Sequence, residues 1–288
     1  MTLNDATIRK HLTCHNVYSL PHKHLRSSVN EVFLIGDNNY ILRMHKNNNA
    51  SKETISNILH QPYQARELYS LGANVVPTAS SYACIDDDWV STLWHYGKPT
   101  ENHNDITTAL SSLHNVEYSH SKNSLKLSRM DIASIIEQRL HRFIHKTPHK
   151  EIANYVIKEM SKIRQENDVI SHYGNHIVHL DGYQRNVVIF NDIPSLIDLD
   201  TLSIGAYQYD YIVSYVSQHY SHENKNTLSL PEEVEKWELF HEAFHLRTMD
   251  MFSWICEMSL MSPEHEKELL LRYASLEQEI DYKWNMEL

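Results

Sequence analysis

The chain has 288 residues, a formal net charge of −11 at pH 7, and contents of 41% hydrophobic and 22% charged residues. This composition is typical of a soluble globular protein, and the length suits two lobes or domains better than one small core. The acidic charge argues against a nucleic-acid partner and is compatible with a cationic small substrate.

The N-terminus and the cysteines bear on the compartment. No apolar run approaches the roughly 18 residues that a membrane span needs, and MTLNDATIRKHLTCHNVYS lacks the basic-then-apolar pattern of a signal peptide. We therefore expect a cytoplasmic protein without a membrane partner. Cys14, Cys84 and Cys256 are far apart in the sequence and form no CxxC motif, so we expect them to be reduced and structural.

The N-terminal third, residues 1–97, has the pattern of a small sheet with one helical region. VFLIG and YILRM flank a turn at residues 37–39, which predicts a β-hairpin. SKETISNILHQPYQARELYSLGA has helical spacing with Ser51 as its N-cap, and Pro62 predicts a break that divides this helix into two pieces. YACIDDDWVSTLWHY predicts two further strands around a turn at residues 86–88.

The rest of the chain, residues 98–288, is mainly helical in pattern. Residues 104–114, 128–145 and 149–165 carry apolar side chains at helical spacing, and a further helical region begins near Pro231. The order predicts an α+β protein with an N-terminal domain of residues 1–97 and a C-terminal domain of residues 98–288.

One short stretch between these helices, HIVHLDGYQRNVVIFNDIPSLIDLD, carries the candidate chemistry. Asp181, Asn186 and Asp198 interrupt its apolar runs, and His179 precedes Asp181 in the spacing HxDxxxxN. Phosphoryl transfer needs a carboxylate to orient or deprotonate the acceptor hydroxyl, oxygen ligands for Mg²⁺, and a cation for the phosphates. Asp181 suits the first role, and Asn186 and Asp198 suit the second. The structural alternative makes Asp181 part of a turn and Asp198 a strand-end cap.

This stretch resembles the aminoglycoside phosphotransferase-like kinases, including choline-kinase-like members, which share the protein-kinase fold. HLDGYQRN, LIDLD and GAYQYD occur in the order of the family's HGDxxxxN, IDxx and YD motifs. The resemblance covers about residues 20–215. It implies a bilobal fold, with a small N-terminal lobe of antiparallel sheet plus helix and a larger, mainly helical C-terminal lobe.

The resemblance also implies a nucleotide site in the N-terminal lobe for ATP or GTP. Arg43 in YILRM would pair with the phosphates, with Lys46 as the alternative contact, and Glu67 in ARELYSLGANVVPT would pair with Arg43. The other implied nucleotide contacts are Ser27, Ser28 and Asn30 in RSSVNEVF, and Leu93 and His95 in STLWHY.

In the C-terminal lobe the resemblance makes Asp181 the catalytic residue and Asn186 and Asp198 the Mg²⁺ ligands. His179 and Asp210 would brace the catalytic loop.

The sequence departs from the family pattern at three positions. Leu180 replaces the usual Gly before Asp181, Arg185 stands where Gly is frequent, and Arg43 stands where Lys is more usual. The last exchange replaces a point charge with a planar fork of donors.

The C-terminal helices contain a second motif. HEAFH, from His241 to His245 with Glu242 between them, fits the HExxH pattern of zinc hydrolases. Because no third ligand is fixed by the sequence, we favour an amphipathic helix with solvated or substrate-facing polar side chains.

Acidic side chains of this region are candidates for contacts to an aminated substrate. They are Glu235, Glu238, Glu242 and Asp250. Asp200 is a further candidate, either for the substrate or for the metal site.

The sequence therefore predicts an ATP- or GTP-dependent, Mg²⁺-dependent phosphotransferase that acts on a hydroxyl of an aminoglycoside-like or other antibiotic. A kinase for choline, ethanolamine or an amino sugar is the alternative with the same chemistry. A zinc hydrolase and a nucleotide-binding pseudokinase are the alternatives from other classes. The substrate is expected to be small, hydroxylated and cationic, and the protein to be a monomer or homodimer.

Overall fold

The computed structural model describes residues 3–27, 30–47, 52–118, 125–221, 229–277 and 282–285. The chain forms two compact units. The first comprises Met1–Glu101, Ser111–Lys126 and Arg185–Thr201, and the second comprises Asn102–Leu110, Leu127–Gln184 and Leu202–Leu288. The division expected from the sequence cuts the chain once after residue 97, whereas residues 185–201 group with the N-terminal part of the chain.

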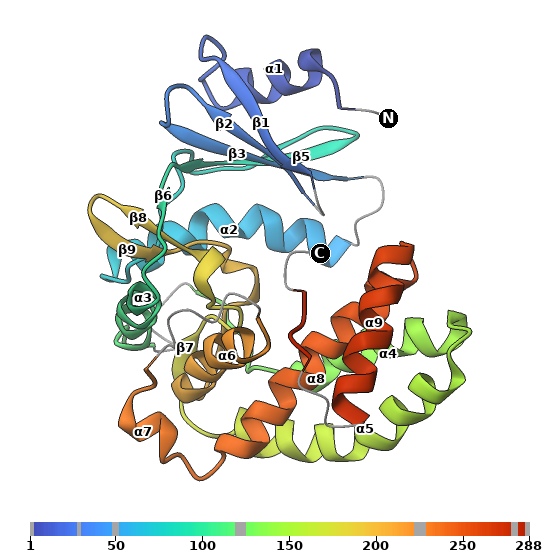
Figure 1. Cartoon of the computed structure of the whole chain (residues 1–288). Helices are drawn as coiled ribbons and strands as arrows, with labels where there is room; N and C mark the ends of the chain where they lie inside the picture. The colour runs from blue at the N-terminus through green and yellow to red at the C-terminus, as the bar shows by residue number, and fades with distance from the viewer. Residues whose placement is uncertain are drawn as a thin grey trace. The chain divides into compact units, whose positions relative to one another are not determined.

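A five-stranded antiparallel sheet organises the first unit. Its strands are β1 (His22–Ser27), β2 (Asn30–Ile35), β3 (Tyr40–Lys46), β4 (Cys84–Ile85) and β5 (Trp89–His95), in the spatial order β1-β2-β3-β5-β4. The predicted hairpins around residues 37–39 and 86–88 are confirmed as β2–β3 and β4–β5. Helices α1 (Asp5–Cys14) and α2 (Lys52–Ser70) cover opposite faces of this sheet (Figure 1).

Strand alternation decides which side chains of β3 can meet. Leu42 and Met44 are fully buried in the core cluster that includes Leu12 of α1. Successive side chains of a strand point to opposite faces, so Arg43 lies on the other face, the one covered by α2. Lys46 follows the alternation of Leu42 and Met44, and its Nζ atom lies 5.9 Å from the centroid of the Trp89 ring. Lys46, expected as an alternative phosphate contact, is therefore on the opposite face of β3 from Arg43.

Helix α2 runs unbroken through Pro62. The predicted division into two pieces was therefore wrong. A proline inside a helix removes one hydrogen bond and costs about 3 kcal/mol, but Ile58, Ala65 and Leu68 on the same helix are buried. Burying these side chains is enough to offset that cost. The predicted N-cap, Ser51, lies outside the described residues.

A three-stranded sheet completes the first unit. Strands β8 (Val187–Phe190) and β9 (Ile193–Leu196) form a hairpin, and β6 (Lys98–Pro99) pairs with β8. The short 3₁₀ helices η1 (Gln184–Asn186) and η2 (Leu199–Thr201) lie immediately before and after this hairpin.

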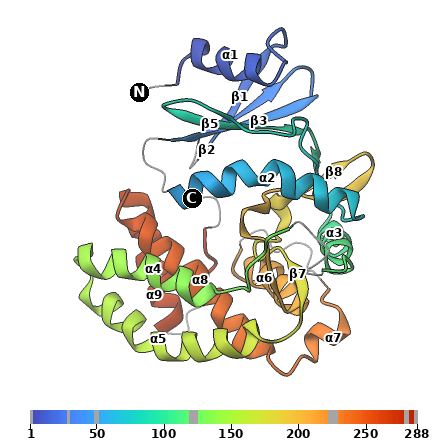
Figure 2. The ribbon, with the colours of Figure 1, turned by 180° about the vertical axis from the view of Figure 1, so that it is seen from behind.

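Helices dominate the second unit. They are α4 (Ile132–Lys146), α5 (Lys150–Ser171), α6 (Tyr207–Tyr220), α7 (Glu232–Glu235), α8 (Phe240–Ser259) and α9 (Pro263–Glu277). Helix α8 packs against α4, α5, α6 and α9, and Figure 2 shows these helices together. A two-stranded sheet joins β7 (His176–Val178) to β10 (Ser203–Gly205). The predicted helices at 128–145 and 149–165 are confirmed as α4 and α5, and the helix at 104–114 as α3 (Asn104–His114).

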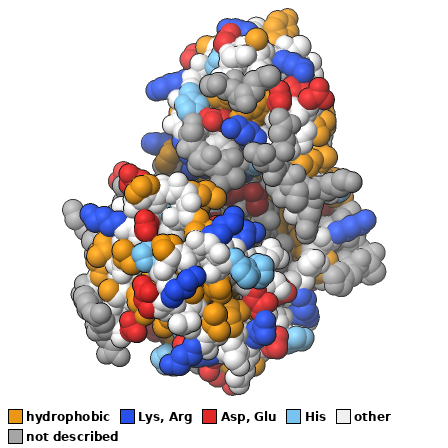
Figure 3. All heavy atoms as spheres, turned by 90° about the vertical axis from the view of Figure 1, so that its right-hand side faces the viewer, with side chains coloured by type: hydrophobic (Ala, Val, Ile, Leu, Met, Phe, Trp, Pro, Cys, Tyr) orange, Lys and Arg blue, Asp and Glu red, His pale blue; other side chains and the backbone are white. Residues whose placement is uncertain are grey.

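The surface in Figure 3 carries acidic, basic and apolar side chains that are interspersed with one another. Among the described parts of the chain, no helix combines the length and the apolar character needed to cross a membrane.

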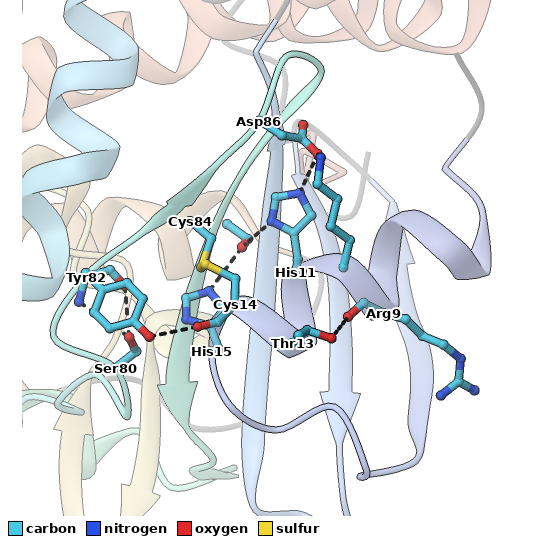
Figure 4. The surroundings of a disulfide bond; sticks show 11 residues. Arg9, His11, Thr13, Cys14, His15, Ser80, Tyr82, Cys84 and Asp86 are labelled. Atoms are coloured by element: carbon cyan, nitrogen blue, oxygen red, sulfur yellow. Dashed lines mark hydrogen bonds and ion pairs between the residues drawn. A yellow bond between two sulfur atoms is a disulfide. The ribbon is translucent and has the colours of Figure 1, made fainter.

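A disulfide joins Cys14 to Cys84, with their Cα atoms 6.3 Å apart (Figure 4). The expectation that all cysteines are reduced was therefore wrong for two of the three, and only Cys256 is free and buried. The sequence separation of 70 residues concealed the pair, because packing of α1 on the sheet brings the last residue of α1 beside β4.

Candidate active site

In the first unit, Arg43 faces two carboxylates. Its Nη2 atom donates to Asp198 Oδ1 at 3.0 Å and lies 3.8 Å from Asp200 Oδ2. Burial by itself lowers the pKa of Arg43, but the two carboxylates outweigh it and raise that pKa above its ordinary value. Arg43 is thus a fixed positive charge in the group proposed below to meet phosphates.

Helix α2 contributes Gln61 to this group. The buried Gln61 side chain donates through Nε2 to Asp200 Oδ1. Glu67, the expected partner of Arg43, lies about 9 Å further along the helix. Within the described residues no ion pair joins it to Arg43, whose carboxylate partners are Asp198 and Asp200. The expected Arg43–Glu67 pair is therefore replaced by contacts to the β8–β9 segment.

The β8–β9 hairpin brings Asn186 and Asp198 to the same end. Val187 pairs with Leu196, and the Ile197 N–H donates to the Asn186 carbonyl at 3.0 Å. Asp198 has a positive φ of 63°, a conformation that Asp adopts more readily than most residues. The hairpin pairing therefore fixes the backbone of both candidate metal ligands.

The chemistry of these donors fits Mg²⁺. An amide oxygen of Asn186 and carboxylate oxygens of Asp198 are hard ligands, and Asp200 is a third oxygen donor in the group. The described residues hold no group of three or more His, Cys, Asp or Glu side chains arranged as a metal cage. Mg²⁺ usually takes one or two carboxylates and fills its remaining positions with water and substrate phosphates, so an incomplete protein shell suits it.

The remaining expected nucleotide contacts have varied surroundings. Ser28 lies outside the described residues, Ser27 is described only as backbone at the end of β1, and Asn30 in β2 pairs with His45. The Leu93 carbonyl accepts hydrogen bonds from Ala79 and Ser80 at 2.9 and 3.4 Å, so it is occupied within the protein. The ring of His95 packs against Tyr40 and Phe190, with centroids 5.8 and 5.7 Å apart.

In the second unit, Asp181 follows a constrained residue. Leu180 is buried and has a positive φ of 63°. For a residue other than Gly, Asn or Asp, this left-handed conformation costs about 1–2 kcal/mol. The position at which the family pattern has Gly thus requires a conformation that Gly adopts freely.

Asp210 holds this loop. Its carboxylate accepts the backbone N–H of His179 at 2.7 Å and that of Leu180 at 2.6 Å. Asp210 and His179 are fully buried, and hydrogen bonds to a buried carboxylate are among the stronger ones in proteins. The two bonds fasten the residues before Asp181 to the start of α6.

Asp181 itself contacts an arginine that the sequence analysis missed. Arg247 on α8 donates through Nη2 to Asp181 Oδ1 at 3.3 Å and through Nη1 to Asp250 Oδ2. Arg139 on α4 donates to Asp250 Oδ1 at 2.7 Å. Asp250 is buried between two arginines, which corrects the expectation that it meets an aminated substrate. The i,i+3 spacing of Arg247 and Asp250 was the available signal, but it does not reveal Asp181 as the further partner.

The described residues give HEAFH no zinc site. His241 is exposed, and His245 Nδ1 lies 2.6 Å from Glu166 Oε2 and its Nε2 lies 3.6 Å from Glu159 Oε2, both on α5. No three-residue metal group is found in the described part of the chain. The described residues therefore give the zinc-hydrolase alternative no support, and His245 instead joins α8 to α5. Of the other acidic candidates, Glu235 and Glu238 are exposed and Glu242 is half-buried.

No protein-family model matches this chain, and no curated protein matches it in sequence. Among solved structures, the ternary complex of a thermostable mutant of aminoglycoside phosphotransferase APH(4)-Ia with ADP and hygromycin B has a TM-score of 0.63 at 10% identity, covering 94% of this chain and 97% of that chain. The amicoumacin kinase hAmiN with AMP-PNP, Ca²⁺ and Ami has a TM-score of 0.60 at 14% identity, covering 90% and 88%. A microcompartment-associated aminopropanol kinase has a TM-score of 0.54 at 15% identity, covering 95% and 98%.

These identities are low, so the likeness concerns the fold. The antiparallel sheet of the first unit and the helices of the second are the fold elements that these small-molecule kinases also have. The chain has the α+β, protein-kinase-like fold of the aminoglycoside phosphotransferase-like kinases.

Proposed function

We propose that the protein is a small-molecule kinase that transfers the γ-phosphoryl group of ATP or GTP to a hydroxyl of a small molecule. The observation that carries this proposal is the group of Arg43, Asp198 and Asp200 beside Asn186 in a kinase-like fold. It supplies the cation and the hard oxygen ligands that phosphoryl transfer requires.

In the proposed reaction Asp181 orients the acceptor hydroxyl and takes its proton. The hydroxyl oxygen forms a bond to the γ-phosphorus while the bond to the β-phosphate oxygen breaks, and the nucleoside diphosphate leaves. Asn186 and Asp198 would hold Mg²⁺, which when bound offsets the negative charge of the phosphates. Arg43 pairs with the phosphates after exchanging part of its contact with Asp198.

An antibiotic of the aminoglycoside type is our first choice of acceptor, and a small amino alcohol or amino sugar is the second. Antibiotics occur in the names of two structural neighbours, and aminopropanol occurs in that of a third. Because Asp250 is already paired with Arg139 and Arg247, a cationic group of the substrate would have to meet Glu238 or Glu242 instead. We propose that the protein works as a monomer or homodimer.

The cytoplasmic location stays a prediction. Disulfides such as Cys14–Cys84 are rare in cytosolic proteins of mesophiles and frequent in oxidising compartments. Fractionation of cells that express the tagged chain would decide between the two.

The decisive experiment is a phosphate-transfer screen with labelled ATP and GTP. The acceptor panel contains aminoglycosides, other hydroxylated antibiotics, choline, ethanolamine and aminopropanol, and Asp181→Asn serves as the inactive control. Transfer to at least one acceptor by the wild type, reduced roughly 10²–10⁴-fold in Asp181→Asn, is expected. Mg²⁺-dependent thermal stabilisation by ATP without transfer to any acceptor would favour the pseudokinase.

A further inference from the structure

We propose that Arg247 is a positioning residue that fixes the carboxylate of Asp181 for reaction, and that Asp250 and Arg139 hold Arg247 in place. The inference rests on the proposed function and deepens it, because it assigns a role to a charged chain that lies behind the proposed catalytic residue.

Four side chains form this chain, with alternating charge. Asp181 meets Arg247 at 3.3 Å, and Arg247 meets Asp250, which meets Arg139 at 2.7 Å. The two inner side chains, Arg247 and Asp250, are 10% and 11% exposed, whereas Asp181 is 38% exposed. The chain thus runs from a carboxylate that solvent or substrate can reach into the helical core.

Burial makes the contact a constraint rather than a surface ion pair. An exposed arginine would move together with its carboxylate, and exposed ion pairs of this kind contribute little to stability. Arg247 is fixed from behind by Asp250, which Arg139 fixes in turn through α4. A guanidinium held in this way restricts rotation of the Asp181 carboxylate, and pre-set orientation of this kind is a large part of catalysis.

Charge balance also connects Arg247 with Asp181. Asp250 contacts both arginines, and Glu257 is a further carboxylate 3.9 Å from Arg139. Arg247 has Asp181 as its second carboxylate contact. Removing Arg247 therefore leaves Asp250 paired with Arg139 but removes a positive charge from Asp181. Phosphoryl transfer places further negative charge near the reacting hydroxyl, and a nearby guanidinium offsets that repulsion.

The charge group also predicts what Asp250 does. A carboxylate that bound a substrate amine would, when neutralised, raise the KM for the acceptor and leave kcat nearly unchanged. If Asp250 instead anchors Arg247, replacing Asp250 by Asn would lower kcat, because the carboxylate of Asp181 would be misplaced after the substrate has bound.

The kinetic test compares three variants with an acceptor found in the screen. We expect Arg247→Met to lower kcat about 30- to 100-fold with the KM for ATP within about twofold of wild type. Arg247→Lys, which keeps the charge and loses the fork, should recover part of that loss. Asp250→Asn should lower kcat about fivefold to tenfold without a matching rise in the acceptor KM.

Arg272→Met is the matched control. Arg272 is also buried and helix-borne, and its Nε donates to Glu268 at 2.8 Å. Its replacement removes a buried guanidinium at a site outside the charge group, so kcat should stay within twofold of wild type even if thermal stability falls. Equal kcat losses in Arg247→Met and Arg272→Met would mean that Arg247 is only structural and would overturn the inference.

A second measurement does not depend on turnover. Crystal structures of the wild type and of Arg247→Met, or of Arg247→Lys if the first variant does not fold, would show whether the Asp181 side chain leaves its rotamer. An unchanged, equally ordered Asp181 in the variant would contradict the inference. A wild type that transfers phosphate to no acceptor would contradict the proposed function instead, so the two failures are distinguishable.

Discussion

The two units hold their proposed acidic residues in different ways. In the first unit Asp198 has a positive φ itself and contacts Arg43, a cation that phosphates would also attract. In the second unit the positive φ falls on Leu180, one residue before Asp181, and Asp210 and Arg247 fasten the loop and the carboxylate. Under the proposed function, the nucleotide-binding residues of the first unit would exchange partners when phosphates bind, whereas the acceptor-binding residues of the second unit would stay in place.

The largest effect is expected from Asp198→Asn. This change removes a metal-binding charge, so phosphate transfer should fall by roughly 10³-fold, about 4 kcal/mol of barrier. Mg²⁺-dependent thermal stabilisation by ATP should disappear as well, whereas Asp181→Asn should lose transfer and keep the stabilisation. Thermal shift assays with Mg²⁺ and ATP check both variants. If Mg²⁺ and ATP stabilised Asp198→Asn and Asp181→Asn equally, the proposed difference between the residues around Asp198 and those around Asp181 would not hold.

Reduction of the disulfide should have the next largest effect. The 70-residue separation of Cys14 and Cys84 closes a long loop, and loss of such a bond typically costs about 2–4 kcal/mol. Urea unfolding of the wild type with and without dithiothreitol, and of Cys14→Ser, measures this cost.

The same variant separates the two faces of the sheet. Because α1 and Arg43 lie on opposite faces, Mg²⁺·ATP stabilisation of Cys14→Ser should equal that of the wild type once the lower starting stability is subtracted. Dithiothreitol should have no effect in the variant. Weakened nucleotide binding in this variant would mean that the sheet face covered by α1 affects the nucleotide contacts of Arg43 on the opposite face.

Acid should destabilise the α1 face. His15 is buried beside Tyr82 (Figure 4) and shares Ser91 with His11, through contacts of 3.1 and 2.8 Å to the hydroxyl. Burial, reinforced by His11, lowers the pKa of His15 to about 4, and burial lowers that of His11 as well. The unfolded chain takes up protons near pH 6.5, so this contribution to stability is complete above about pH 6.5 and is lost as the pH falls towards 4.

The expected loss at pH 5 is up to about 2 kcal/mol for His15. Urea unfolding at pH 7.5 and pH 5 measures it, and His15→Gln should reduce the difference between the two midpoints. An unchanged difference in this variant would place the acid sensitivity elsewhere in the chain.

The parts predicted from the sequence are those that depend on near neighbours in the chain. The hairpins around residues 37–39 and 86–88 follow from turn residues between apolar runs, and the helices from their apolar spacing. The motif order indicated the fold because the stretch around Asp181 is nearly continuous in the sequence. Pro62 misled because the packing of α2 outweighs a local penalty.

The parts that escaped prediction join residues that are distant in the chain. Gln61 contacts Asp200, Cys14 contacts Cys84, and Arg247 contacts Asp181. Spacing cannot predict the Gln61 and Arg247 contacts, since many acidic and amide side chains are equally distant, and it does not choose among the three pairings that three cysteines allow. The Arg247 contact also changes the interpretation of Asp250, which has the sequence character of an exposed acidic ligand but is buried in a salt bridge.

The smallest expected effect concerns Leu180, the residue before Asp181 whose backbone has a positive φ. Leu180→Gly loses the buried side chain, and Leu180→Ala loses nearly as much while keeping a Cβ atom at a φ of 63°. Their difference therefore isolates the conformational cost. At ordinary helical or extended positions Gly is less stable than Ala by roughly 0.5–1 kcal/mol, but here we expect Gly to be more stable than Ala by about 1 kcal/mol. Urea unfolding of both variants measures the sign. A more stable Ala variant would mean that the loop gives up this conformation when the leucine is removed, and that Asp210 does not hold the acceptor side in place.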